Sequence, residues 1–205
     1  RARFLASSHA FTLAEVLVTL GIIGVVSAMT VPSLMQNHQK KTYVTQLHKV
    51  YNEVQQVVTM YLTDKNALNL TEAGINSNAK AQEFITDYFK IVQTCENSLT
   101  PCFANSYKYL NSTDDVNVLD GHSSTSFVLA NGASVRPIYV NDGKISKVMN
   151  ILVDTNGQKG PNILGRDTFN YNAVSLPLTE DERNSADANW KPFGQILNDN
   201  WEMNY

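Results

Sequence analysis

The chain has 205 residues, with 16 basic and 19 acidic side chains and a formal net charge of −3 at pH 7. This length is enough for one membrane segment and one modest globular domain. The near balance of charge excludes the overall basic field that is typical of nucleic-acid-binding proteins. We therefore expect no nucleic acid among the partners of this protein.

An apolar run dominates the N-terminal region. From Val16 to Met35, about twenty consecutive residues carry no ionisable side chain, which is long enough to span a bilayer core as a helix. One carboxylate, that of Glu15, lies where the run begins, and an acid in lipid is costly unless it has a positive partner. Since no basic residue lies nearby on the same helix face, we expect the partner of Glu15 to come from outside the helix.

Residues 1–10 are short and polar and carry Arg1 and Arg3, as the n-region of an export signal does. The run that follows is too long for an ordinary signal and has no cleavage site at its far end, so we expect it to stay in the mature protein. Lys40 and Lys41 balance the basic residues on the other side, and charge alone leaves the orientation open. The position of the cysteine-containing domain favours an N-terminus in the cytoplasm.

The helical pattern continues beyond the apolar run, because apolar residues then recur at intervals of three and four. We expect one helix from about Phe11 to Leu62, apolar all round in its first half and amphipathic in its second half. Pro32 removes one backbone hydrogen bond and predicts a kink or a locally melted segment. The second half has the pattern of a helix that packs on a sheet.

A second helix is predicted over residues 79–93, with Asn78 as its candidate cap. From Ser126 the apolar period changes to two, and Asn131-Gly132 predicts a hairpin with a type I′ turn. No regular element is predicted after residue 178. The expected strands are residues 126–130, 133–140, 145–153 and 167–174. The fold class is therefore α+β, with a long N-terminal helix packed on an antiparallel sheet.

The chain has two cysteines, Cys95 and Cys102, with six residues between them. They form neither a CxxC redox motif nor a metal-binding quartet. A short disulfide loop is favoured, because the apolar N-terminal run implies export to an oxidising compartment. Such a loop would stabilise the fold by about 2–3 kcal/mol in the chain-entropy model. The alternative is a pair of unrelated buried thiols.

A glycine-rich segment runs from Asp154 to Phe169. Unusual backbone dihedrals are predicted at its three glycines, Gly157, Gly160 and Gly165. Four of its side chains could together offer oxygen ligands to calcium, namely those of Asp154, Asn156, Asn162 and Asp167. The plainer interpretation is a structural loop in which Arg166 contacts Asp154 or Asp167, since the spacing does not fit an EF-hand.

The sequence contains no recognisable catalytic motif. The four histidines are far apart, and no segment fits a nucleophile elbow or a phosphate-binding P-loop. We expect no enzymatic activity and, apart from calcium at the loop, no cofactor.

Residues 10–35 resemble the N-terminal signature of type IV pilins and pseudopilins. The resemblance is carried by Phe11, Thr12-Leu13, Glu15, the Gly-Ile-Ile-Gly segment and Pro32. It implies a pilin-like α/β roll with three regions: a prepilin leader (1–10), a transmembrane and assembly half of the helix (11–36) and a periplasmic or extracellular domain (37–205). Ala10 stands where the family most often has Gly, and alanine is also small.

In that family a prepilin peptidase cuts before the Phe and methylates the new amino terminus, which places cleavage here between Ala10 and Phe11. The resemblance implies that Glu15 then pairs with the Phe11 amine of a neighbouring subunit and sets the axial register of a filament. Pro32 would let the helix bend or melt as the subunit leaves the membrane. The implied partners are the peptidase, an inner-membrane assembly platform, membrane lipid before assembly, and other pilin subunits.

Two functions of different classes follow. The first is a structural subunit of a type IV filament, either a pilus or the pseudopilus of a type II secretion system. Such a subunit first sits in the bacterial inner membrane with its N-terminus in the cytoplasm, and later in a periplasmic or cell-surface filament. The alternative is a membrane-anchored periplasmic binding domain that does not polymerise and that binds calcium.

Overall fold

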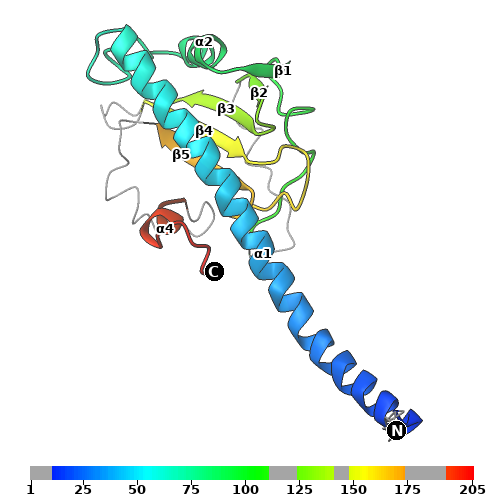
Figure 1. Ribbon diagram of the computed structural model, residues 1–205. Coiled ribbons are helices and arrows are strands. Elements are labelled where there is room, and N and C mark those ends of the chain that lie inside the picture. Colours follow the sequence, from blue (N-terminus) through cyan, green and yellow to red (C-terminus); the bar gives the residue numbers. More distant parts are fainter. Residues whose placement is uncertain (1–10, 111–123, 141–147, 174–192) are drawn as a thin grey trace, which may run out of the picture. The chain divides into compact units, whose positions relative to one another are not determined.

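The computed structural model describes residues 11–110, 124–140, 148–173 and 193–205. The chain divides into two compact units, Arg1–Gln39 and Lys40–Tyr205. Helix α1, Leu13–Asp64, contributes its first half to the first unit and its second half to the second unit (Figure 1). The second unit also contains a five-stranded sheet, and this α+β arrangement confirms the predicted fold class.

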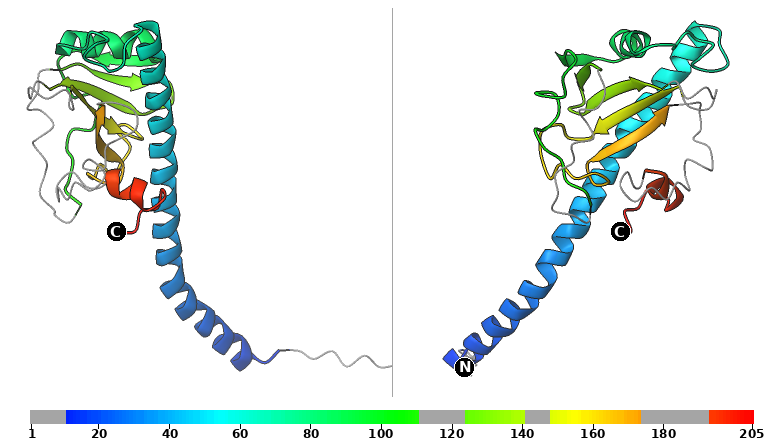
Figure 2. Two further views of the ribbon diagram at one scale, coloured as in Figure 1. Left: turned by 90° about the vertical axis from the view of Figure 1, so that its left-hand side faces the viewer. Right: turned by 180° about the vertical axis from the view of Figure 1, so that it is seen from behind.

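Helix α1 lies within two residues of the predicted helix at each end. It continues through Pro32 without interruption, so a locally melted segment is not observed at this position. In its second half, the buried side chains recur at helical spacing and form one stripe: Val44, Leu47, Val50, Val54, Val57, Val58 and Tyr61. This stripe packs along one face of the sheet (Figures 1 and 2), as the amphipathic pattern predicts.

The sheet is antiparallel, and its strands follow one another in sequence order. The strands are β1 (Ile91–Cys95), β2 (Ser126–Leu129), β3 (Ser134–Tyr139), β4 (Met149–Asp154) and β5 (Thr168–Ala173). Direct register partners Phe127, Val135, Val153 and Phe169 form a row of buried side chains on the face toward α1. Alternate residues such as Leu152 point to the opposite face, as the period of two requires. Both faces are therefore covered.

The second predicted helix is shorter than expected. Helix α2 spans Asn78–Tyr88, and its cap is Ser77, whose Oγ accepts a hydrogen bond from the Lys80 backbone N–H at 3.3 Å. Asn78 is the first helical residue, so its assignment as the cap is wrong. The predicted helix also extends wrongly to residue 93, because Ile91 pairs with Leu129 of β2 and starts a strand. The apolar residues after α2 fit both the helical and the strand period, and pairing with β2 decides that they form a strand.

The hairpin between β2 and β3 is confirmed, but its turn is not type I′. That turn requires a left-handed φ at both central residues, whereas Gly132 has a φ of 89° and Asn131 has no such φ. The N–H of Gly132 donates to Leu129 O at 2.9 Å, which defines a type I turn followed by a glycine bulge. The Asn131 side chain holds this turn in place, because its Nδ2 donates a hydrogen bond to the Glu53 carboxylate of α1 at 2.6 Å.

The end of the chain contains a short helix that the sequence does not predict, α4 (Phe193–Asn198). After it, the indole of Trp201 stacks on His48 with 4.0 Å between ring centroids and meets Tyr51 edge-on at 5.2 Å. Trp201 has a left-handed φ of 62°, which is unusual for a bulky residue. These ring contacts hold the C-terminal segment against the second half of α1.

The predicted disulfide between Cys95 and Cys102 is confirmed. It joins the end of β1 to a segment that covers the sheet face opposite α1. A second, smaller core lies beneath this segment and includes Leu99, Phe103, Tyr107, Leu152 and Leu164. The hydroxyl of Ser134 donates to Cys102 O at 2.5 Å and ties the segment to β3.

Candidate functional site

The first half of α1 contains the described residues that the sequence assigns to processing and assembly. Every residue from Phe11 to Gln39 is exposed, including Phe11 at 85% and Leu34 at 66%. By length and composition, α1 is the one helix among the described residues that could cross a membrane, and its apolar window has no buried residue. Exposed apolar surface of this extent marks a contact with lipid or with protein. Ala10 lies outside the described residues.

Glu15 forms a capping box with Thr12 at the start of α1. The Glu15 Oε2 accepts hydrogen bonds from the Thr12 backbone N–H at 2.8 Å and from its hydroxyl at 2.9 Å. In return, the Glu15 backbone N–H donates to Thr12 Oγ1 at 3.2 Å. These bonds satisfy backbone groups that the first turn of a helix leaves without partners. Thr12 therefore sets where α1 begins.

The sequence interpretation missed this role of Thr12 and looked for a partner of Glu15 only outside the helix. The Thr-x-x-Glu spacing directly before an apolar run is the sequence signature of a capping box and identifies the pair. Both partners in the box are satisfied by hydrogen bonds, but the threonine carries no charge. The box therefore explains the helix start and leaves the negative charge of Glu15 without compensation from Thr12.

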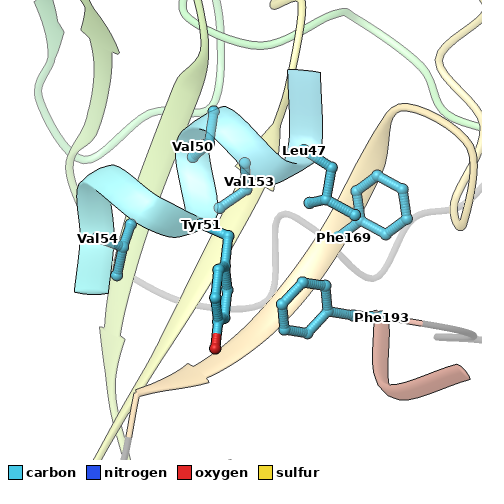
Figure 3. Close-up of a pocket in the computed structure, with 7 residues that line it drawn as sticks. All are labelled: Leu47, Val50, Tyr51, Val54, Val153, Phe169 and Phe193. Atoms are coloured by element: carbon cyan, nitrogen blue, oxygen red, sulfur yellow. The ribbon is translucent and has the colours of Figure 1, made fainter. Parts of the chain in front are cut away.

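An apolar cavity lies under the second half of α1 (Figure 3). It is lined by Leu47, Val50, Tyr51, Val54, Val153, Phe169 and Phe193. Its volume of about 10 Å³ has room for at most one water molecule. The cavity is thus a small packing gap in the core and not a ligand site.

The loop between β4 and β5 contains two buried carboxyl groups. Asp154 is fully buried, and its Oδ2 accepts a hydrogen bond from the Tyr107 hydroxyl at 2.6 Å. Burial, aided by the nearby carboxylate of Asp167 and opposed by the hydrogen bond from Tyr107, raises the pKa of Asp154 to about 8. Burial beside this acid also raises the pKa of the Tyr107 phenol. The disulfide-linked segment and the loop are therefore joined through an interior hydrogen bond.

Asp167 closes the loop through its side chain, which binds the loop backbone. Its Oδ2 and Oδ1 accept hydrogen bonds from the N–H groups of Asn162 and Ile163, each at 2.8 Å. Burial raises the pKa of Asp167, while these backbone hydrogen bonds oppose that shift. This geometry is that of a structural loop, in which side-chain oxygens satisfy the N–H groups of a tight turn.

Two details of the predicted loop are wrong. Arg166 is exposed, and within the described part of the chain it forms no ion pair with Asp154 or Asp167. Left-handed φ values occur at Gly157 and Gly165 as expected, but the third such residue is Asn162, with a φ of 56°, and not Gly160. A Cβ at Gly157 would also lie 3.3 Å from Ser134 Oγ. This position therefore requires glycine for two reasons.

The four candidate calcium ligands, Asp154, Asn156, Asn162 and Asp167, all lie in this one loop. The described residues include no group of three or more His, Cys, Asp or Glu side chains placed to bind a metal ion. However, Asn156 Oδ1 and Asn162 Oδ1 are buried and accept no hydrogen bond from the described residues. Amide oxygens of this kind suit calcium, so the donor set fits the ion in part. Calcium binding stays a prediction.

The buried Asp154 predicts how stability depends on pH. An unfolded aspartate loses its proton near pH 3.9, whereas the folded chain keeps this proton up to about pH 8. Between these values the folded state binds more protons, so the free energy of unfolding falls as pH rises, by up to about 1.4 kcal/mol per pH unit. We expect urea unfolding of the full chain in detergent micelles, measured from pH 5 to pH 8, to show this decline.

The variant Asp154→Asn cannot titrate, so its decline should be shallower than that of the wild type. Asp87→Asn, at an exposed acid on α2, is the matched control and should keep the wild-type slope. An Asp154→Asn variant with an unchanged slope would contradict the assignment of the decline to this carboxyl group.

The whole chain was compared with known proteins. It matches no protein-family model, no curated protein and no solved structure.

Proposed function

We propose that this protein is a structural subunit of a type IV pilus-like filament, a pilin or a pseudopilin. The observation that carries the proposal is the first half of α1, which is apolar on all sides and exposed from Phe11 to Gln39. A helix of this kind needs a covering surface from outside its own domain. Lipid covers it before assembly, and the helices of neighbouring subunits cover it in the filament.

The charge of Glu15 supports assembly through a processed N-terminus. The capping box satisfies hydrogen bonds at the helix start but supplies no positive charge. An uncompensated carboxylate is costly in an apolar environment, so it favours contact with an amine. Cleavage between Ala10 and Phe11 would release such an amine, and pairing with the Phe11 amine of a neighbour would fix the axial register.

The other roles follow from the same proposal. A prepilin peptidase would cut and methylate the chain, and an inner-membrane assembly platform would receive it. The subunit would sit in the bacterial inner membrane with a cytoplasmic N-terminus before it enters a periplasmic or cell-surface filament. Pro32 would lower the cost of bending α1 during extraction, because its ring already removes one hydrogen bond of the helix.

Two substitutions of Glu15 separate its charge from its capping role. Glu15→Ala removes both, whereas Glu15→Gln keeps an oxygen that can complete the capping box. If the charge pair drives assembly, both variants should insert into the membrane normally but enter filaments at less than about a tenth of the wild-type level, since losing a buried charge pair costs about 3–5 kcal/mol. The measurements are membrane fractionation and immunoblotting of sheared filaments.

Thr12→Ser is the control for this experiment, because serine retains the capping hydroxyl and the charge of Glu15 is unchanged. It should assemble as the wild type does. Wild-type assembly of Glu15→Gln would contradict the charge pair, and wild-type assembly of Glu15→Ala would contradict the filament function of this residue altogether.

A second candidate function is that of a membrane-anchored, calcium-binding domain that does not polymerise. The observation that favours it is the pair of buried, unbonded amide oxygens at Asn156 and Asn162. They lie in the same loop as two buried carboxyl groups that no described cation neutralises. A bound calcium ion would displace the proton of Asp154, compensate the charge of both carboxylates and give these oxygens a partner.

This candidate is tested by thermal unfolding of the full chain with and without calcium. Saturation at about one hundred times Kd adds about 2.7 kcal/mol, which corresponds to a rise in Tm of about 5–10 °C for a domain of this size. Asn162→Gly removes the amide oxygen and tolerates the left-handed φ, so it should abolish the rise. An unchanged wild-type Tm in millimolar calcium, or an equal rise in the variant, would rule out this site.

A further inference from the structure

Three cations gather at the point where the chain enters the second unit. Lys40 and Lys41 are the first two residues of this unit, and Arg166 lies in the loop before β5. Lys41 and Arg166 are exposed, and Lys40 is half-buried. We call these three residues the basic collar. Lys41 and Arg166 form no ion pair with another described residue, whereas the Lys40 ammonium contacts the main-chain oxygen of Tyr205.

The C-terminal residue links the members of the basic collar. The Lys40 ammonium donates to Tyr205 O at 2.6 Å, and the Tyr205 hydroxyl donates to Gly165 O, also at 2.6 Å. Arg166 directly follows Gly165, so these two hydrogen bonds connect the start of the unit to the β4–β5 loop. Residues far apart in the sequence thus place three positive charges in one region.

Acidic groups nearby offset this charge only in part. Asp167 is fully buried, and both of its oxygens accept hydrogen bonds from loop backbone. Asp199 is half-buried, and Glu202 is the exposed acid of the C-terminal segment. Among the described residues, the exposed side chains at this point of the unit are therefore mainly positive.

Helix α1 itself keeps Lys40 and Lys41 of the basic collar close to the apolar run. The apolar run ends at Met35, five residues before Lys40. Helix α1 continues through this stretch, so these five residues span about 8 Å. The polar headgroup layer on each side of a bilayer is about 5–8 Å thick. In a membrane-inserted chain, Lys40 and Lys41 would therefore lie about 8–9 Å beyond the end of the apolar run, at the outer edge of this layer, and their long side chains could extend into it.

We propose that the basic collar binds the phosphates of anionic phospholipids while the subunit is in the membrane. The inference rests on the proposed membrane-inserted state. Arg and Lys both recognise phosphate, Arg through two parallel hydrogen bonds and Lys as a point charge. Because the apolar run tethers the domain to the bilayer, the local headgroup concentration is high and three cations suffice. The contact would orient the domain on the membrane before assembly.

The test uses the full chain reconstituted in phosphatidylcholine bilayers that contain spin-labelled lipid. Electron paramagnetic resonance then gives the association of labelled phosphatidylglycerol relative to labelled phosphatidylcholine at the protein surface. We expect a preference of several-fold for phosphatidylglycerol, weakened in 1 M salt because salt screens exposed charges. Each cation removed should lower the preference by up to about fivefold.

The double variant Lys41→Gln/Arg166→Gln should bring the preference close to one. Lys65→Gln is the matched control, since Lys65 lies 24 residues from Lys41 along and just beyond α1, about 36 Å away at helical rise. It should keep the wild-type preference. An unchanged preference in the double variant, an equal loss in the control, or no preference in the wild type would overturn the proposal.

Membrane insertion itself is measured in parallel, by resistance of the reconstituted chain to extraction with alkaline carbonate. A chain that inserts but shows no lipid preference refutes the collar alone. A chain that fails to insert refutes the membrane stage of the proposed function, and the collar with it.

Discussion

The burial of α1 is the constraint on which the rest of this structure depends. In its second half, one stripe of side chains from Val44 to Tyr61 is covered by the sheet, and polar residues occupy the other sides. In its first half, apolar side chains cover every side, and all of them are exposed. A single continuous helix therefore contains two segments whose apolar side chains need cover. The domain of this chain covers those of the second half, and the described residues leave those of the first half exposed.

Two carboxyl groups, those of Glu15 and Asp154, form hydrogen bonds at important points of the fold. At the start of α1, the Thr12–Glu15 capping box satisfies backbone groups that the first helical turn leaves without partners. Across the sheet, the Asp154–Tyr107 hydrogen bond joins the disulfide-linked segment to the β4–β5 loop. Both interactions use carboxyl groups, but Asp154 is buried and can be neutral below about pH 8, whereas Glu15 is exposed on α1. Under the proposed function, the charge of Glu15 makes the covering surface specific.

Sequence periodicity was sufficient to predict α1, the β2–β3 hairpin, β4 and β5, because each has apolar residues at one clear spacing. The disulfide followed from the compartment that the apolar run implies. Strand β1 was missed because Ile91 and Val92 continue the helical spacing of α2, and only pairing with β2 decides their conformation. Helix α4 and the docking of Trp201 on His48 depend on contacts between distant segments, which no local pattern encodes. At the candidate site, the Thr-x-x-Glu spacing is enough to predict the capping box. The exposed position of Arg166 could not be predicted from the sequence pattern of its loop.

The central claim is that Phe11 becomes the first residue of the working subunit. Mass spectrometry of the N-terminal peptide from the natural protein tests this most directly. The account predicts a peptide that starts at Phe11 and carries one methyl group on its α-amine, with residues 1–10 removed. A mature protein that retains Arg1–Ala10 would have no free amine at Phe11 to pair with Glu15, and it would contradict the account.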